Sequence, residues 1–153
     1  MRSMRFAAIA LAATLLVVCG RVDASPQAAS AVRVATPSDI AWASVAGYPP
    51  GYARAMLEGE AASAVPFTYR VRLPASFRFQ PHTHRSDEHV TVLQGTWSFG
   101  VGETFDAARL KPVPTGSFVV IPAGTPHFVA TEREAIIQVH GVGPIGFEPV
   151  TGR

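Results

Sequence analysis

The sequence predicts an all-β fold, a barrel or a sandwich built from short strands. Three features favour it. Apolar and polar residues alternate in several segments, other segments are dense in β-branched residues, and glycine- and proline-rich turn sequences recur between them. No helix of ordinary length and no internal repeat is evident in residues 25–153. Short strands at regular spacing, separated by turn signals, are typical of antiparallel barrels and sandwiches.

Residues 1–24 have the composition of a secretory signal peptide. Arg2 and Arg5 precede the apolar run "FAAIALAATLLVV", and the small-residue stretch "VDA" ends at Ala24. We expect cleavage after Ala24 and a secreted or periplasmic protein. A retained membrane anchor is disfavoured because the run is shorter than the roughly 20 residues that span a bilayer. A lipoprotein at Cys19 is also disfavoured, because a valine precedes the cysteine where a small residue is expected.

Loss of this leader changes the charge of the protein. The full chain has 13 basic and 11 acidic residues, and the leader carries three arginines and one aspartate. Ten basic and ten acidic residues remain in the exported chain, with no basic run, which disfavours nucleic acid and anionic membranes as partners. Cys19 is the only cysteine, so the exported chain contains no disulfide. Its length fits one domain with a core of its own.

The first part of the exported chain carries little pattern. Residues 25–36 are small and polar, and we expect a flexible lead-in. The domain proper is expected over residues 37–150. Within it, "PPG" at residues 49–51 marks a turn, and residues 53–58 are expected to form at most a weak helical turn.

Strand signals then follow one another along the chain. Residues that share one face of an alternating segment are Phe67, Tyr69, Val71 and Leu73, then Glu88, Val90 and Val92, then Trp97, Phe99 and Val101. The first of these segments is expected to be half-buried, with Arg70 and Arg72 in water. The β-branched runs "SFVVIP" and "EAIIQVHG" predict two more strands.

Two phrases about thirty residues apart carry chemistry. They are "HTHRSDEHVTVLQG" at residues 82–95 and "GSFVVIPAGTPH" at residues 116–127. Together they supply three imidazoles and one carboxylate, on His82, His84, Glu88 and His127. Alternate residues of an extended segment share a face, so the first two histidines can aim at one point. Imidazole and carboxylate suit divalent iron, manganese, nickel, cobalt, copper and zinc.

These phrases resemble the two signature motifs of the cupin superfamily, G-x5-H-x-H-x3-4-E-x6-G and G-x5-P-x-G-x2-H-x3-N. The matching positions are His82, His84, Glu88 and Gly95 in the first motif and Gly116, Pro122, Gly124 and His127 in the second. Ser76 stands in place of the leading glycine and Thr131 in place of the final asparagine. Neither of these two positions is a metal ligand in the family.

The resemblance covers residues 66–147 and implies a double-stranded β-helix, or jelly-roll barrel. It also implies a short irregular N-terminal leader, which in such proteins often packs against the outside of the barrel. The metal ligands would be His82, His84, Glu88 and His127. The alternative is a cupin barrel with vestigial ligands, or histidines that only pack in a core.

One difficulty concerns which side chains face inward before His82. On a regular strand, inward-facing His82 and His84 would place Arg78 inside the barrel as well. A bulge at Pro81 would reset the alternation, because proline in a strand is typical of edges and bulges. We therefore expect Phe77 and Phe79 to pack and Arg78 to be solvated.

Four further residues could lie near the proposed site. His89 follows Glu88 directly and is expected on the opposite face of its strand. His140 is either a pocket residue or an exposed strand-end histidine. Val129 and Thr131 share the face of His127 and are candidates to line the cavity.

The resemblance and the ligand set suggest a metal-dependent enzyme that acts on a small organic molecule. Four protein ligands would leave two positions on an octahedral iron or manganese ion, which suits oxygenase or oxidase chemistry. The resemblance implies dioxygenase-like activity first, ahead of isomerase, decarboxylase and lyase activity. No serine–histidine–acid set and no catalytic cysteine is recognisable. The alternative is a non-catalytic barrel that binds a metabolite or a metal. A homodimer is left open.

Overall fold

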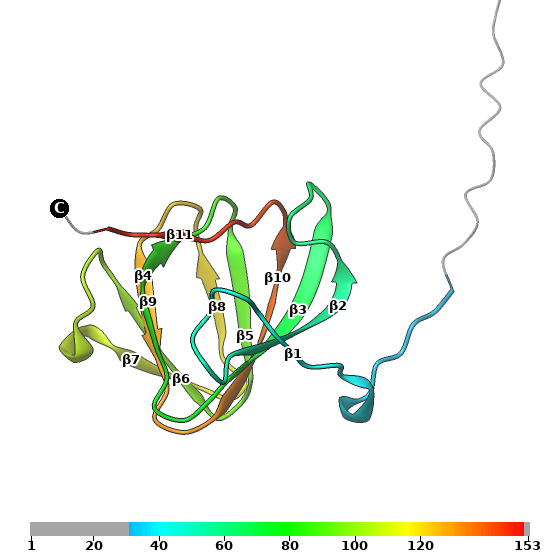
Figure 1. The fold of residues 1–153 in the computed structure, drawn as a ribbon, viewed down its shortest axis with the longest axis horizontal. Helices are drawn as coiled ribbons and strands as arrows, with labels where there is room; N and C mark the ends of the chain where they lie inside the picture. The colour runs from blue at the N-terminus through cyan, green and yellow to red at the C-terminus, as the bar shows by residue number, and fades with distance from the viewer. Residues whose placement is uncertain (1–30, 152–153) are drawn as a thin grey trace, which may run out of the picture. The chain divides into compact units, whose positions relative to one another are not determined.

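The computed structural model describes residues 31–151, and the regular elements in this part are almost all β-strands (Figure 1). The predicted leader, residues 1–24, and residues 25–30 of the lead-in lie outside the described residues. The elements are η1 (Pro37–Asp39), β1 (Ala43–Ser44), β2 (Ala53–Gly59), β3 (Pro66–Leu73), β4 (Arg78–Thr83), β5 (Glu88–Gln94), β6 (Thr96–Val101), η2 (Ala107–Arg109), β7 (Lys111–Pro114), β8 (Phe118–Ile121), β9 (His127–Ala130), β10 (Ala135–Val142) and β11 (Glu148–Pro149).

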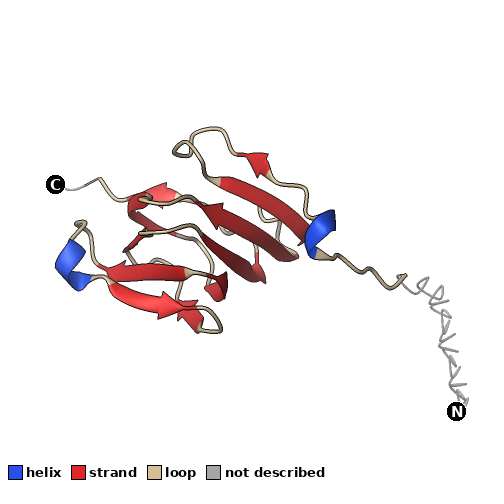
Figure 2. Ribbon diagram, turned by 90° about the horizontal axis from the view of Figure 1, so that it is seen from below, coloured by secondary structure: helices blue, strands red, loops and turns tan. Residues whose placement is uncertain are grey.

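The strands form two antiparallel sheets. One has the order β1-β2-β3-β10-β5-β8 and the other the order β11-β4-β9-β6-β7. Figure 2 shows the two sheets as separate layers. Strands that are neighbours in a sheet are mostly far apart in sequence, as in the pairing of β3 with β10. The predicted all-β jelly-roll barrel is confirmed, with the core between the inner faces of the two sheets.

The alternation in β3 sets one side of that core. Its inward residues Phe67, Tyr69, Val71 and Leu73 are all buried, as predicted. The outward arginines are only partly in water. Arg70 Nε donates to Gln138 Oε1 at 3.2 Å, and the guanidinium of Arg72 lies 4.3 Å from the centre of the Trp42 ring. The aliphatic parts and guanidinium groups of these arginines therefore cover the outer face of the sheet and remain in partial contact with water.

The expected weak helical turn at residues 53–58 is wrong. This segment is strand β2, which pairs antiparallel with β3 from Ala53↔Arg72 to Gly59↔Phe67. A register shift between Met56 and Glu58 interrupts the pairing. The backbone hydrogen bonds to β3 outweigh a local helix preference that amounts to only tenths of a kcal/mol per residue, about 0–0.7.

The bulge expected near Pro81 is present. The register of β4 with β9 shifts between Phe79 and His82, which leaves Gln80 and Pro81 unmatched. As predicted, Phe77 is buried, Phe79 packs against the core, and the side chain of Arg78 is exposed. The bulge thus lets Phe79 and His82, which are three positions apart and would face opposite sides of a regular strand, face the same interior.

The two departures from the cupin motifs also have structural explanations. Ser76 adopts φ 57°, the left-handed conformation that a glycine in this place adopts without strain. Thr131 is buried, and its Oγ1 donates to the carbonyl oxygen of Pro74 at 2.6 Å. This bond fastens the turn before β4 to the strand that carries His127.

Candidate metal centre

The fold brings all four residues predicted as metal ligands to one place in the barrel. His82 lies on β4 opposite His127, the first residue of β9, and their rings are 4.2 Å apart. His84 follows β4, and Glu88 is the first residue of β5. One ring nitrogen from each of the three histidines lies within 4.8 Å of the others. Glu88 Oε2 is 3.5 Å from His84 Nε2 and 3.7 Å from His127 Nε2.

Backbone carbonyl groups fix which nitrogen of each ring carries a proton. The Nδ1 atoms of His82, His84 and His127 lie 2.8, 2.8 and 3.0 Å from the carbonyl oxygens of Gln80, Gly146 and Thr125. A carbonyl oxygen only accepts, so each Nδ1 is the donor and each Nε2 keeps its lone pair in a neutral ring. The three rings are held in the tautomer that metal-binding histidines use.

Burial keeps the imidazoles of His82 and His127 neutral. Desolvation, with a smaller contribution from His127, lowers the pKa of His82 to about 3, and desolvation lowers the pKa of His127 to about 4. Burial also raises the pKa of Glu88, against the opposing effect of His84. Around neutral pH the cluster therefore offers lone pairs and a carboxyl group, without an ammonium or guanidinium group among the lining residues.

This donor set fits a transition-metal ion. Three imidazole nitrogens and a carboxylate oxygen meet, and among the described residues none of the three Nε2 atoms accepts a hydrogen bond from a backbone N–H or a hydroxyl group. A divalent cation would satisfy all of these acceptors at once, and imidazole with carboxylate is a ligand set for iron, manganese, zinc and their neighbours. The three histidines can hold a metal ion, and Glu88 lies within reach as a further ligand.

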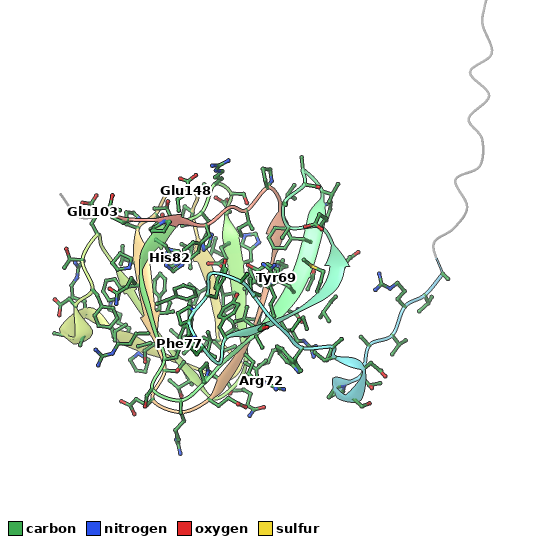
Figure 3. The ribbon with its side chains drawn as sticks, in the orientation of Figure 1. Tyr69, Arg72, Phe77, His82, Glu103 and Glu148 are labelled. Atoms are coloured by element: carbon green, nitrogen blue, oxygen red, sulfur yellow. The ribbon has the colours of Figure 1, made fainter. Side chains whose placement is uncertain are left out.

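The cluster lies at one end of a pocket between the sheets. The other lining residues are mainly apolar or aromatic, and among them are Tyr48, Tyr52, Tyr69, Phe79 and Phe147. In Figure 3, His82 and Tyr69 lie inside the barrel, whereas Glu103 and Glu148 lie at its periphery. The space open to the centre of a water molecule is about 50 Å³. Only a small molecule, or the end of a larger one, fits this space.

The expectation that the leader packs on the outside of the barrel is wrong in one respect. The segment before β2 brings Tyr48 and Tyr52 to the pocket, and in Figure 1 it crosses the front of the barrel. Their rings stack at 4.5 Å, and the Tyr52 ring lies 5.9 Å from that of Phe79. Burial of these aromatic faces holds the segment at the site. Sequence reasoning missed both tyrosines, because a turn signal does not show which way the side chains on either side of the turn point.

The segment before β11 also belongs to the site and was missed. The Phe147 ring stacks on that of His82 at 4.6 Å, and the carbonyl group of Gly146 accepts from His84. Arg85 fastens this segment from the other side, with its Nε 2.6 Å from Glu148 Oε1. The sequence does not predict this role, because apolar and polar residues do not alternate regularly in the segment.

The remaining candidates divide between the two faces of the sheets. His89 lies on the face opposite Glu88, as predicted, and Val129 lines the pocket. His140 does not line the pocket; it pairs with His89 across the strands, with the rings 5.0 Å apart. Thr131 is buried but bonds to the turn before β4 instead of lining the cavity.

Comparison with known proteins places this fold. The family profile described as the ChrR Cupin-like domain matches residues 30–145. The polyketide cyclase RemF from Streptomyces resistomycificus is similar in structure, with a TM-score of 0.66 at 18% identity over 80% of this chain and 88% of that chain. No curated protein sequence matches the chain significantly.

Two other similar structures are of enzymes that are named for other activities. The DMSP lyase DddQ from Ruegeria pomeroyi DSS-3 has a TM-score of 0.55 at 24% identity, covering 70% of this chain and 58% of that chain. A salicylate 1,2-dioxygenase from Pseudaminobacter salicylatoxidans has a TM-score of 0.55 at 13% identity, covering 67% of this chain and 31% of that chain. At these identities the likeness concerns the fold alone. The profile match spans well over half of the chain, and with this fold it shows that the chain belongs to the cupin superfamily, in the family described as the ChrR Cupin-like domain.

Proposed function

We propose that this protein is a metal-dependent cupin enzyme with dioxygenase-like activity on a small organic molecule. The proposed ligands are His82, His84, Glu88 and His127, and iron or manganese is the favoured metal. One observation carries the proposal: three Nε2 lone pairs and a buried carboxyl group converge at one end of a pocket between the sheets. When bound, a redox-active octahedral ion would supply two adjacent open coordination positions.

The chain's own residues supply geometry and a dry environment. The carbonyl groups of Gln80, Gly146 and Thr125 hold the three rings in place before any ion arrives. The carboxyl group of Glu88 is buried, so its charge acts through a medium of low dielectric constant. Phe147 stacks on His82 and helps to keep water from that side of the site. Such preorganisation reduces the reorganisation that binding and reaction require.

A non-catalytic binding barrel is the second candidate, and one observation favours it. Apart from the four proposed ligands, no histidine, carboxylate, lysine or arginine is among the residues that line this pocket. Proton transfer would depend on tyrosine hydroxyl groups or on water. A protein that only stores or senses a metal or metabolite has no need of such a group.

We also propose that the protein is exported. The sequence of residues 1–24 supports this proposal, with cleavage after Ala24, and Cys19 as a lipidation site is the alternative. No helix among residues 31–151 is long and apolar enough to span a membrane. Intact mass of the protein recovered from the exported fraction tests the cleavage. A chain that retains its first residues, or carries lipid on Cys19, would contradict it.

Metal content and oxygen uptake test the enzyme proposal together. Protein purified from its own compartment is expected to contain close to one equivalent of a transition metal by elemental analysis. Oxygen uptake is then measured with phenolic and keto-acid compounds on iron-, manganese- and zinc-loaded protein. We expect uptake with iron or manganese and none with zinc. Bound metal without product under any metal would favour the binding barrel.

A further inference from the structure

Three tyrosine side chains give the pocket a set of unused hydrogen-bond donors. Tyr48, Tyr52 and Tyr69 all line it, and they come from the segment before β2 and from β3. None of their hydroxyl groups forms a hydrogen bond with another described residue. Their oxygen atoms are also absent from the fully buried, unpartnered atoms of the described residues, so each meets open space. A hydroxyl group that meets open space without a protein partner is available to a bound molecule.

These hydroxyl groups remain protonated under ordinary conditions. Burial raises the pKa of all three tyrosines, and the opposing effect of Arg54 is smaller in each case. Each is therefore a neutral hydroxyl group that can donate one hydrogen bond. A molecule that exploits them must present acceptor oxygens or nitrogens on the side facing β3.

The charge balance of the site limits the charge of that molecule. A divalent ion and the Glu88 carboxylate together leave one positive charge. No lysine or arginine lines the pocket, and the guanidinium of Arg54 lies 5.3 Å from the centre of the Tyr69 ring. A buried second negative charge would have no counter-charge among the lining residues and would carry a large desolvation penalty. One negative charge on the ligand is balanced, and a phosphate ester is not.

The walls and the size of the pocket limit its shape. Tyr48 stacks on Tyr52, Phe147 stacks on His82, and the aliphatic side chains of β3 and β10 cover much of the rest. Aromatic faces favour flat, apolar partners. Since one water needs roughly 10–15 Å³ for its centre and about 30 Å³ of liquid, the pocket holds on the order of four waters, or about 120 Å³ of ligand. That is close to the volume of one substituted ring.

We propose, resting on the metal-dependent function above, that the substrate class is a small planar molecule that binds as a monoanion: an enol, a phenol or a hydroxyketone that has lost its hydroxyl proton to water. Two of its oxygens would face the metal centre, and its flat body would lie between the aromatic walls. The hydroxyl groups of Tyr52 and Tyr69 would donate hydrogen bonds to its oxygens. Sugars and phosphorylated compounds are outside this class, because the pocket offers few polar partners and no side-chain cation.

Binding of tropolone, a flat monoanionic chelator with two adjacent oxygens, tests this assignment. The experiment uses metal-loaded protein, with metal content measured before and after titration, and compares the wild type with Tyr52→Phe and Tyr69→Phe. Each substitution removes one hydroxyl group and keeps the ring. We expect each to weaken tropolone binding by about three- to tenfold, the range for one hydrogen bond.

Thr68→Val is the matched control. Thr68 lies next to Tyr69 on β3 but on the outward face, opposite His140, so loss of its hydroxyl group should leave tropolone binding unchanged. Melting curves of the variants show whether they fold like the wild type. A second titration uses glucose 6-phosphate, which should bind at least tenfold more weakly than tropolone.

The outcomes separate this inference from the proposed function. Protein that holds metal but binds glucose 6-phosphate better than tropolone, or binds tropolone equally well in all variants, overturns the substrate class and leaves the metal centre intact. Protein that takes up no metal overturns the proposed function, and this inference falls with it. Protein that holds metal and does not bind tropolone overturns the inference alone.

Discussion

Substitution of His127 tests the metal centre most directly. This residue is only 1% exposed, holds its tautomer through Thr125, and lies opposite His82. His127→Ala removes one of the proposed metal ligands. The informative quantity is the rise in melting temperature that metal causes in each protein, since loss of a buried ring also lowers the stability of the metal-free protein.

The expected size of this effect follows from linkage between binding and folding. Metal at one hundred times its dissociation constant stabilises the folded state by about 2.7 kcal/mol. For a domain of this size that is a rise of about 10 °C in melting temperature, at roughly 3–5 °C per kcal/mol. If loss of the ligand weakens binding a hundredfold, the same metal concentration gives only about 0.4 kcal/mol. His127→Ala should then melt within about 2 °C of its own metal-free form.

Differential scanning fluorimetry with and without manganese measures both increments, and His89→Ala serves as the control. His89 is adjacent to Glu88 in sequence but faces the other side of β5, so its replacement should keep most of the metal-induced rise. Should His127→Ala fail to fold, His127→Asn keeps a polar side chain of smaller size for the same comparison. Equal increments in the His127 and His89 variants would refute the assignment of the metal to the barrel interior.

Three further outcomes are expected. In the unfolded chain His82 and His127 have the ordinary pKa of 6.5, whereas in the folded protein their pKa values are about 3 and about 4. Between these values the unfolded chain binds more protons, so acid favours unfolding. In urea melts of metal-free protein, the free energy of unfolding should fall from pH 6.5 towards pH 4. Thr131→Val leaves the carbonyl group of Pro74 without its buried partner and should lower the free energy of unfolding by about 1–3 kcal/mol in urea melts. Ser76→Gly relieves the backbone strain of a left-handed serine at φ 57° and should raise the melting temperature by the equivalent of about 1 kcal/mol. A melting temperature below that of the wild type would contradict the argument.

Much of the fold could be predicted because local patterns and the pairing of the strands agree. The alternation of β3 and of β5 assigns Tyr69 and Glu88 to the interior, and the structure buries both. The bulge before His82 was expected because proline cannot donate to a strand ladder. The helical turn predicted at residues 53–58 was wrong for the opposite reason. This short segment has only a weak preference for any secondary structure, and pairing with β3 decides its conformation.

The outcome for His140 shows where sequence reasoning stops at a strand end. Its neighbour Val139 is buried, so the period of two places His140 outside, beside His89. From the sequence alone a bulge could reset this alternation, as one does before His82. The register with the neighbouring strands, which depends on the whole sheet, removes that freedom.

The sequence by itself determined the donor groups of the candidate centre: the types of the proposed ligands, their spacing, and the strands on or beside which they lie. Only the tertiary structure decided what surrounds them. Tyr48, Tyr52 and Phe147 come from segments without a regular period, and they reach the pocket because the barrel offers an apolar surface on which their rings pack. The protonation of the histidine rings depends likewise on carbonyl groups such as that of Gly146, 62 positions from its partner. Periodicity encodes the direction of a side chain within one strand, whereas contacts between distant segments form only when the whole chain folds.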